Sequence, residues 1–403
     1  MPETGHAEVL IVGGGIIGLA VAWRVRRRGM VVTLLERGAT GQGTSRVAAG
    51  MLAPVAEVEF GQAGRRALEL GLRSSAMWPA FAAELQEASD VELELRQTGT
   101  LLLARDADEA RELERQLCLR GSLGLRVERL RPSEAREREP ALAPTLRLAL
   151  EAPDDHSIDP RPVLAALREA CERAGVKLRE HTAVARVELD GDRVCGVALE
   201  DGERIAAEQI VLAAGPWSEL IAGLPSGARV PVRPVKGQIL RLRDPAGPGL
   251  LRRTVRFEGG YLLPRGDGRY VLGASMEERG FELAPTAGGV HELLRDAHEL
   301  VPGVRDLQIE ELAVGLRPGT PDNAPAIGHG ALDGLLWATG HHRNGILLAP
   351  LTAELLTGLL DPSAVAPDAQ ELLGTCAPGR FTPPPGAAEA AEESSLASAG
   401  GLL

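Results

Sequence analysis

Runs of hydrophobic residues near the beginning, the middle and the end of the chain predict buried β-strands. The first run, VLIV, leads into a glycine turn and a helix-like stretch, and a second strand, VVTLLE, then ends at Glu36. The later runs are QIVLAAG, which ends at Gly215, and LLWATG. Continuous apolar runs of this length are typical of strands that are covered on both faces.

Helical and β-like patterns alternate between these strands. Asp190-Gly191-Asp192 joins two strand-like runs and is a hairpin signal, and Asp159-Pro160 is suited to begin a helix. We expect helices at residues 63–87, 106–120, 160–174, 289–300 and 346–359. We expect strands at residues 91–104, 183–189 and 194–199, and a mostly β pattern with short turns at 230–275.

Strands of the nucleotide-binding type therefore come from three separate parts of the chain, with β-rich segments between them. We predict an α/β (α+β) fold, in which a Rossmann-like cofactor domain carries an inserted, mostly antiparallel β-sheet domain that binds the substrate. The expected cofactor domain comprises residues 1–90, 151–225 and 316–377. The expected substrate domain comprises residues 91–150 and 226–315, and residues 378–403, rich in Pro, Ala, Glu and Ser, form an expected disordered tail.

The glycine turn fits the G-x-G-x-x-G pattern of dinucleotide binding. Gly13 permits the tight turn, Gly15 lets a pyrophosphate approach the backbone, and Gly18 lets the helix pack closely on the strand. The amides at the helix start would face the phosphates. Glu36 follows about 20 residues later, where an acid hydrogen-bonds a ribose hydroxyl. Because strands, helix and acid are all in place, the pattern favours a nucleotide site over an empty glycine turn.

Length, charge and cysteine usage narrow the class of protein. A chain of 403 residues suggests two or more domains. Its net charge of −12 disfavours a nucleic-acid partner, which would need a basic face. The four cysteines lack metal-ligand spacing and no secretion signal is apparent, so we expect no metal site and a cytoplasmic location. The apolar run from Val9 to Trp23 is too short to span a bilayer, and we expect no stable membrane association.

Four segments resemble the FAD-dependent amino acid oxidase family, which includes D-amino acid oxidase, sarcosine oxidase and glycine oxidase. They lie within roughly residues 7–365 and read VLIVGGGIIGLA, GTSRVAAGMLAP, IVLAAGPWS, and GLRPGTPDNAPAIG followed by WATGHHRNGILLAP. The second and fourth are most similar to the glycine oxidase branch, whose members supply dehydroglycine for the thiazole moiety of thiamine. The resemblance implies an enzyme with FAD as cofactor.

The resemblance also implies which residues contact FAD. Positions matching Thr44 and Ser45 contact the phosphates, those matching Ala49, Gly50 and Met51 lie near the isoalloxazine ring, and Val184 matches a backbone contact at the adenine end. No cysteine falls in the late segment that tethers flavin in some sarcosine oxidases, so we expect non-covalent FAD. The expected cofactor residues are Gly13, Gly15, Ile16, Ile17, Gly18, Glu36, Arg37, Thr44, Ser45, Ala49, Gly50, Met51, Val184, Gly215, Trp217, His342, Arg343, Asn344, Gly345, Ile346 and Leu347.

Family positions likewise indicate the substrate site. Arg317 matches the arginine that binds the substrate carboxylate, which a guanidinium can hold through two parallel bonds. Tyr261 matches a tyrosine that assists the same carboxylate, and the backbone carbonyl matching Arg343 accepts a bond from the amine. We expect Met51 and Met276 to line the pocket. His341 and His342 are neighbouring candidates for a general base, although packing is the commoner role for histidines in such a loop.

These residues imply oxidative deamination of glycine, sarcosine or small D-amino acids by hydride transfer to flavin N5. Molecular oxygen would reoxidise the flavin to give hydrogen peroxide, while the imine yields an α-keto acid and ammonia. The alternatives are a D-amino acid dehydrogenase that passes electrons to a quinone, a sarcosine or proline oxidase, and an FAD-binding scaffold without turnover. The acidic balance disfavours a flavin enzyme acting on tRNA. By analogy with the family we expect a homo-oligomer, namely a tetramer.

Overall fold

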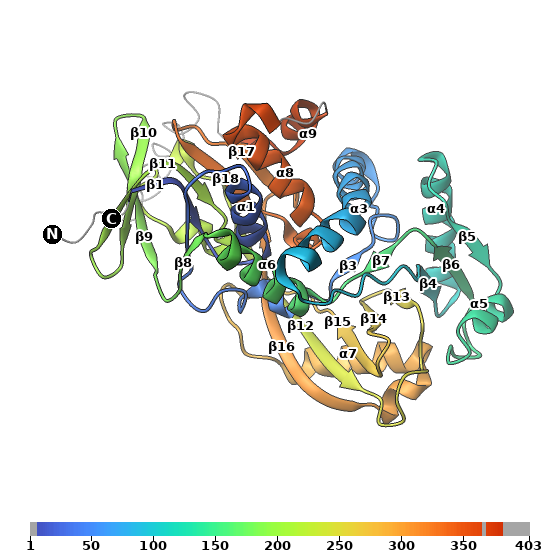
Figure 1. The fold of residues 1–403 in the computed structure, drawn as a ribbon. Coiled ribbons are helices and arrows are strands. Elements are labelled where there is room, and N and C mark those ends of the chain that lie inside the picture. The colour runs from blue at the N-terminus through green and yellow to red at the C-terminus, as the bar shows by residue number, and fades with distance from the viewer. Residues whose placement is uncertain (1–5, 365–367, 382–403) are drawn as a thin grey trace, which may run out of the picture.

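The structure is a computed structural model that describes residues 6–364 and 368–381. Two large β-sheets dominate it, and they lie at an angle to each other with helices on their outer faces (Figure 1). The hairpin β9–β10 forms one end of the molecule, and α4, α5 and β5 form the other.

The first sheet is mostly parallel and contains the predicted nucleotide-binding strands. Its order is β17-β18-β11-β1-β2-β8, and β10 and β9 continue from β11 as an antiparallel hairpin. The strands are β1 (His6–Val12), β2 (Val32–Leu35), β8 (Lys177–Arg179), β9 (Val184–Asp190), β10 (Arg193–Leu199), β11 (Arg204–Leu212), β17 (Ala326–His329) and β18 (Leu335–Thr339).

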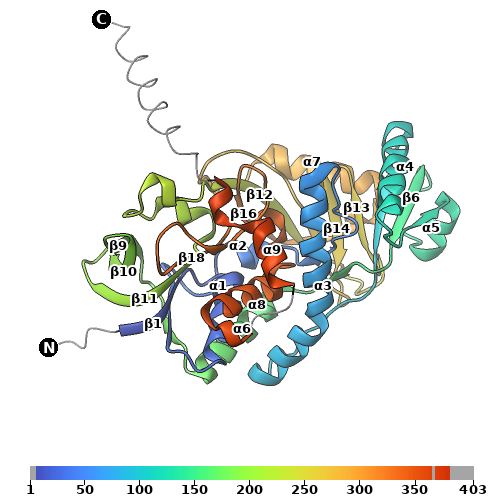
Figure 2. The ribbon, with the colours of Figure 1, turned by 90° about the horizontal axis from the view of Figure 1, so that it is seen from above.

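Helices cover one face of this sheet and share its largest hydrophobic core. Nearly every residue of α1 is buried, because the helix lies between the sheet and two further helices. The long helix α3 extends beside them (Figure 2), and Trp78 and Phe81 of this helix pack edge-to-face in the same core. The helices are α1 (Ile16–Arg26), α3 (Gly61–Ser89), α6 (Pro160–Ala174), α8 (Ala349–Leu360) and α9 (Ala369–Cys376).

The second sheet is antiparallel except where β13 pairs with β4, and its order is β16-β12-β15-β14-β13-β4-β6-β5. Its strands are β4 (Thr100–Ala104), β5 (Glu128–Leu130), β6 (Leu148–Ala152), β12 (Arg233–Arg243), β13 (Thr254–Phe257), β14 (Gly260–Pro264), β15 (Arg269–Gly273) and β16 (Gln308–Gly319). The helices α4 (Ala107–Ser122), α5 (Pro132–Arg138) and α7 (Ala287–Leu300) pack on it.

A short segment after the first βαβ unit reaches the second sheet. This segment contains a helical turn, α2 (Thr44–Val47), and a strand, β3 (Met51–Leu52), which pairs with β7 (His156–Ser157). The Thr44 hydroxyl donates to the Leu316 carbonyl at 2.8 Å. A Cβ on Gly315 would lie 3.1 Å from Val47 Cβ, so the glycine lets α2 pack against β16.

The predicted fold class is confirmed, as are the hairpin at 190–192 and the helix after Asp159, whose carboxylate accepts a bond from the Arg161 amide. Residues 91–104 are a strand only from Thr100 onward. β11 ends at Leu212 rather than at Gly215, because Gly215 has a left-handed φ of 56° and begins the 3₁₀ turn η1 (Gly215–Leu220).

The late part of the chain shows further differences from the prediction. α8 begins at Ala349, three residues after the predicted start, because residues 342–344 first form a 3₁₀ turn, η4 (His342–Asn344). The patterns did not identify β16, β17 or α9. Disorder from residue 378 is wrong at its start: Pro378–Phe381 form a turn (η6) in which Arg380 pairs with Asp322. The rest of that predicted tail lies outside the described residues, and the domain boundaries stay a prediction.

Candidate active site

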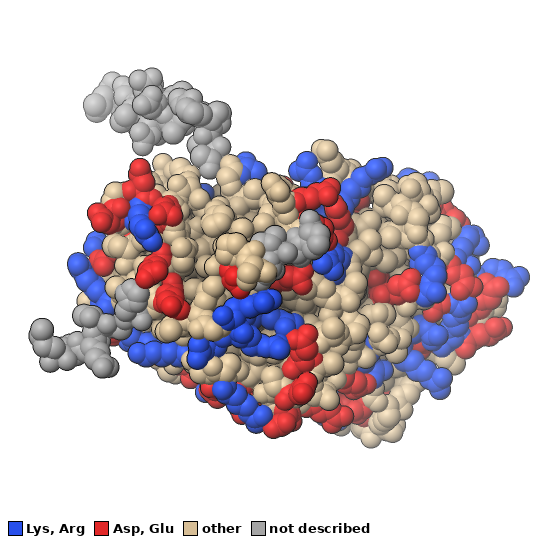
Figure 3. All heavy atoms as spheres, turned by 45° about the horizontal axis from the view of Figure 1, so that its top comes forward, with Lys and Arg blue, Asp and Glu red and all other residues tan. Residues whose placement is uncertain are grey.

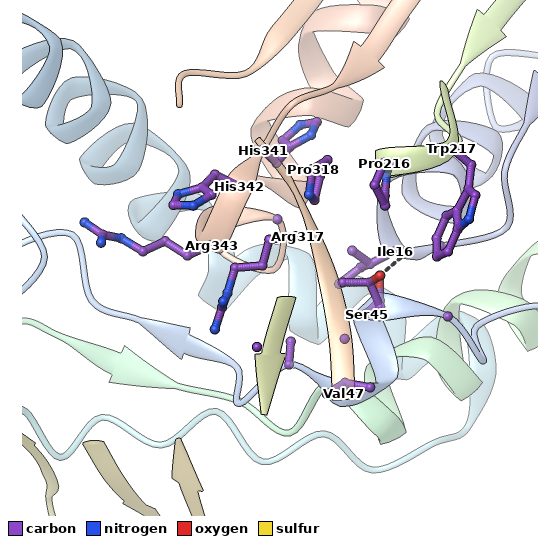
Figure 4. Close-up of a pocket in the computed structure, with 18 of the residues that line it drawn as sticks. Ile16, Ser45, Val47, Pro216, Trp217, Arg317, Pro318, His341, His342 and Arg343 are labelled. Atoms are coloured by element: carbon purple, nitrogen blue, oxygen red, sulfur yellow. Dashed lines mark hydrogen bonds between the residues drawn. The ribbon is translucent and has the colours of Figure 1, made fainter. Parts of the chain in front are cut away.

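A cavity of about 1090 Å³ lies between the two sheets. One end is lined by the glycine turn and the β2 terminus, and the other by β12, β14 and β16 (Figure 4). Of the residues predicted from the sequence, the cavity brings together Gly13, Gly15, Ile16, Ile17, Glu36, Arg37, Thr44, Ser45, Ala49, Gly50, Met51, Val184, Gly215, Trp217, Tyr261, Met276, Arg317, His342, Arg343, Gly345 and Ile346.

Three predicted residues do not line the cavity. Gly18 lies behind it, where a Cβ would be 1.9 Å from the Gly13 carbonyl oxygen, so the residue serves helix packing. The Asn344 amide donates to the His341 carbonyl. The Leu347 carbonyl accepts bonds from Ser74 Oγ and Trp78 Nε1, which places this residue in the helical core. These three positions shape the site from outside.

The start of α1 is built to receive an anion. Gly15 is the N-cap and the first turn contains no acid, so no side chain of the helix itself compensates the dipole that faces the cavity. The Ile16 amide donates to Ser45 Oγ at 3.1 Å (Figure 4), which joins the 44–47 turn to the helix start. Gly13, with φ 114°, lies where a Cβ would be 2.5 Å from the Ala213 carbonyl, so β11 also needs this glycine.

Glu36 lies beside the glycine turn, as the pattern predicts. Its Oε2 accepts from the Gly14 amide at 2.7 Å, and its Oε1 accepts from the Gly38 amide at 2.9 Å. Arg37 stacks over the Trp217 ring at 3.8 Å from its centroid, and both residues line the cavity. The open helix start, the glycine backbone and the fixed carboxylate together fit the diphosphate and ribose of a dinucleotide.

Arg317 lies at the other end of the cavity, on β16. Its guanidinium lies over Gly237 of the neighbouring strand, where a Cβ would be 2.5 Å from both terminal nitrogens. Nη1 donates to the Ser275 carbonyl at 3.1 Å. None of the described Asp or Glu residues forms an ion pair with Arg317. Burial lowers its pKa and the charge of Glu57 opposes this only in part, but an arginine keeps its charge, so a positive fork faces the cavity without a carboxylate in ion-pair contact among the described residues.

Tyr261 of β14 lies close to this guanidinium. Its hydroxyl is 2.6 Å from the position that a Cβ on Gly273 would take, so Gly273 makes room for the ring as Gly237 does for the arginine. Burial raises the pKa of Tyr261, which keeps the phenol protonated and able to donate a hydrogen bond.

Glu57, which the sequence did not single out, holds two further arginines at the cavity wall. Its carboxylate binds Arg256 Nη1 and lies 3.1 Å from Arg343 Nε. Burial raises the pKa of Glu57, but the two arginines outweigh it and lower the pKa overall. Arg343 also pairs with Glu59, and its side chain points in a different direction from that of Arg317 (Figure 4). Of these arginines, only Arg317 is left for an anionic ligand.

The two histidines of the late loop are neutral. Burial lowers the pKa of His341 to about 3, and its Nε2 lies 3.0 Å from Thr352 Oγ1. Burial, followed by nearby arginines, lowers the pKa of His342 to about 4. A packing role therefore fits His341 better than a role as general base. Met276 is 59% exposed and lies at the cavity rim.

Comparison with known proteins defines the class to which this fold and cavity belong. Residues 8–359 match the family model described as FAD dependent oxidoreductase. The chain belongs to this family, the expected FAD-dependent amino acid oxidase family, and FAD is its cofactor.

Within that family the chain is similar to proteins named glycine oxidase. It is 36% identical to the glycine oxidase of Geobacillus kaustophilus, with 91% of this chain and 96% of the relative covered. The crystal structure of a glycine oxidase from the same organism matches with a TM-score of 0.83, 35% identity, and 89% and 95% of the two chains covered. A relative in Synechocystis named bifunctional protein ThiO/ThiG is 35% identical over 93% of this chain, which spans 54% of that protein.

Proposed function

We propose that this protein oxidises glycine and other small amino acids, such as sarcosine and small D-amino acids, with molecular oxygen as electron acceptor. The amino acid is oxidised to an imine, which hydrolyses to an α-keto acid and ammonia (methylamine in the case of sarcosine), and oxygen is reduced to hydrogen peroxide. The observation that carries the proposal is the unpaired guanidinium of Arg317 beside the protonated hydroxyl of Tyr261, in the same cavity as the nucleotide-type turn. The relatives named glycine oxidase support it.

In this proposal the protein mainly binds and orients the substrate. Arg317 would hold the carboxylate through two parallel bonds, and Tyr261 would donate a third. The Arg343 carbonyl would accept a bond from the amine, which has to be neutral to release the hydride. FAD, when bound, would supply the redox chemistry, as an acceptor for the hydride that oxygen can reoxidise. Fixing both ends of the amino acid sets the α-hydrogen in a reactive position, so no side-chain base is required.

The attachment of FAD, the location of the protein, its assembly and its biosynthetic role belong to the same proposal. None of the four cysteines, all of which are described, lines the cavity, which supports non-covalent FAD. No helix among residues 6–364 and 368–381 combines the length and apolarity needed to cross a membrane. We propose a cytoplasmic homotetramer that supplies the thiazole moiety of thiamine, which the ThiO/ThiG relative supports.

Anaerobic titration of the purified yellow protein tests the proposal. We expect glycine, sarcosine and D-alanine to bleach the oxidised flavin absorbance, and readmitted air to restore it with one hydrogen peroxide per amino acid consumed. L-Leucine, which is larger and of the opposite configuration, is the control. Bleaching by none of the small amino acids would contradict the proposal. Bleaching that only a quinone reverses would indicate a dehydrogenase instead.

A further inference from the structure

A group of buried arginines lies behind the segment that joins α2 to β3. Arg241 and Arg265 are 8% and 4% exposed, and they border a second, smaller cavity of about 90 Å³. Neither lines the large cavity, whereas Val47, Ala48, Ala49 and Gly50 do. The arginines therefore reach this segment from the side opposite the proposed flavin site.

Arg265 joins two parts of the chain through their carbonyl oxygens. Its Nη2 donates to the Ala49 carbonyl at 2.6 Å, and its Nη1 donates to the Ile158 carbonyl at 3.2 Å. The Ile158 amide in turn donates to the Gly50 carbonyl at 2.9 Å. A Cβ on Gly50 would lie 1.9 Å from the Ile158 oxygen, so these two backbones are in close contact. The planar guanidinium of Arg265 thus binds both backbone segments of this contact.

Arg241 holds the other end of the segment. Its Nη2 donates to the Arg46 carbonyl at 2.9 Å, and Arg161 Nε donates to the same oxygen at 3.4 Å. Arg265 follows β14 directly, and Arg241 belongs to β12. Through Arg241 and Arg265, the second sheet thus binds the 46–50 backbone at both ends. We call this arrangement the clamp.

The charges of these arginines are poorly compensated for groups so deeply buried. Arg265 Nε lies 3.7 Å from Asp159, Arg241 Nε lies 3.6 Å from Glu311, and neither nitrogen has a hydrogen-bond partner among the described residues. Burial lowers the pKa of Arg265 to about 10, so it remains charged at neutral pH. Burying a cation against carbonyl groups is costly. An apolar side chain of the same size would avoid this cost, but it would leave the Ala49 and Ile158 carbonyls without these donors.

We infer that Arg265, assisted by Arg241, is a positioning residue that fixes the 46–50 backbone against the FAD and couples it to the strands bearing the substrate site. This inference rests on the proposed function only in placing the flavin beside residues 49–51. The clamp itself is a property of the protein chain, with or without cofactor.

The test replaces Arg265 by Met, which keeps the length but donates nothing, and compares it with Arg265→Lys, which keeps the charge without the fork. The matched control is Arg243→Met, at the end of β12, whose side chain is half exposed and pairs with Glu310. We expect Arg265→Met to raise the FAD dissociation constant at least tenfold, since it removes two charge-assisted bonds. Arg265→Lys should recover part of the affinity, and the control should match wild type.

Hydrogen exchange of the protein without FAD gives a readout that does not depend on catalysis. We expect amides of residues 46–52 and 156–158 to exchange faster in Arg265→Met, while α1 and α8 exchange as in wild type. Wild-type exchange and wild-type FAD affinity in that variant would overturn the inference, even if glycine still bleaches the flavin. If Arg265→Met does not fold, the same two measurements on Arg265→Lys decide. If the unaltered protein oxidises no amino acid, the proposed function is overturned, but the inference that Arg265 positions the 46–50 backbone is not.

Discussion

Two glycines in the second sheet determine where the polar groups of the substrate end can lie. Gly237 lets the Arg317 guanidinium lie across β12, and Gly273 makes room for the Tyr261 ring. Small residues inside strands often mark such close approaches, and that was the sequence signal available for both. The arginine and its glycine therefore act as one unit of the site.

Replacing Gly237 by Ala tests this unit. The added methyl would lie 2.5 Å from both terminal nitrogens of Arg317 and displace them, so we expect the KM for glycine to rise at least tenfold while FAD is retained. Steady-state kinetics with a flavin-content assay measures this. Gly288→Ala is the control, because Gly288 lines the same cavity with open space around its Cβ position. Equal KM values for the two variants would contradict the assigned position of Arg317.

The neutral histidines predict how stability depends on pH. Their pKa values, about 3 for His341 and about 4 for His342, lie below the value of about 6.5 in an unfolded chain. At these two positions the unfolded state therefore binds more protons below pH 6.5, and the contribution of the two histidines to stability falls as the pH falls. In urea denaturation we expect each histidine to contribute a loss of about 1.4 kcal/mol per pH unit near pH 5, with the share of His342 decreasing towards pH 4, where its folded state also takes up the proton. His341→Gln should remove about half of this slope, whereas the exposed His329→Gln should keep all of it.

Sequence reasoning reached some site residues and missed others for a physical reason. Arg317 and Tyr261 could be predicted because they lie at positions that match the family. Glu57 and Arg256 could not be predicted, since alternating acids such as those in VAEVEF and a single arginine in a strand are typical of solvated positions. Only the tertiary fold, which brings residue 57 beside residues 256 and 343, turns them into a buried ion cluster.

At the level of elements, the close approach of α1 to the glycine turn determines the geometry of the nucleotide-binding end of the cavity. Gly18 contacts no ligand space, yet a Cβ there would be 1.9 Å from the Gly13 carbonyl oxygen. The helix start can face the cavity only because this contact lets α1 pack on β1. Both the strand and the helix were predictable from their apolar pattern, since each is buried on nearly every side.

Gly18→Ala should therefore damage cofactor binding from outside the cavity. Overpacking at this contact should cost about 1–3 kcal/mol of unfolding free energy and weaken FAD affinity, as measured by urea denaturation and FAD fluorescence. Gly121→Ala is the control, because Gly121 lies in α4 with open space around it, and alanine should stabilise that helix by up to about 1 kcal/mol. Unchanged FAD affinity in Gly18→Ala would show that α1 does not need this close contact.

Element boundaries were harder to predict than elements. The predicted start of α8 assumed that the apolar pattern begins the helix at once, but the backbone turns at His342, where φ is 47°, before the helix forms. β16 escaped prediction because its polar first half is exposed and only its pairing along the whole of β12 defines it. Such pairing is a long-range property that periodicity does not contain.

For the whole molecule, two sheets built from interleaved stretches of the chain enclose one large cavity. Nucleotide-type strands at three places in the sequence were predicted, but the order in which they pair was not. The relative placement of the sheets was not predictable either, since it depends on contacts such as those of α2 with β16. On the face in Figure 3, acidic and basic side chains lie side by side at the end that carries α4 and α5, whereas basic side chains gather in one stretch between the opposite end and the middle.

The central claim is that Arg317 anchors a carboxylate next to the FAD. Acetate, which has the carboxylate but nothing to oxidise, measures this most directly when it is titrated into the oxidised holoenzyme and followed by the flavin absorption spectrum. The account predicts a saturable spectral change in the wild-type protein, and a dissociation constant at least a hundredfold higher in Arg317→Met with FAD still bound. The same dissociation constant in both proteins would contradict it.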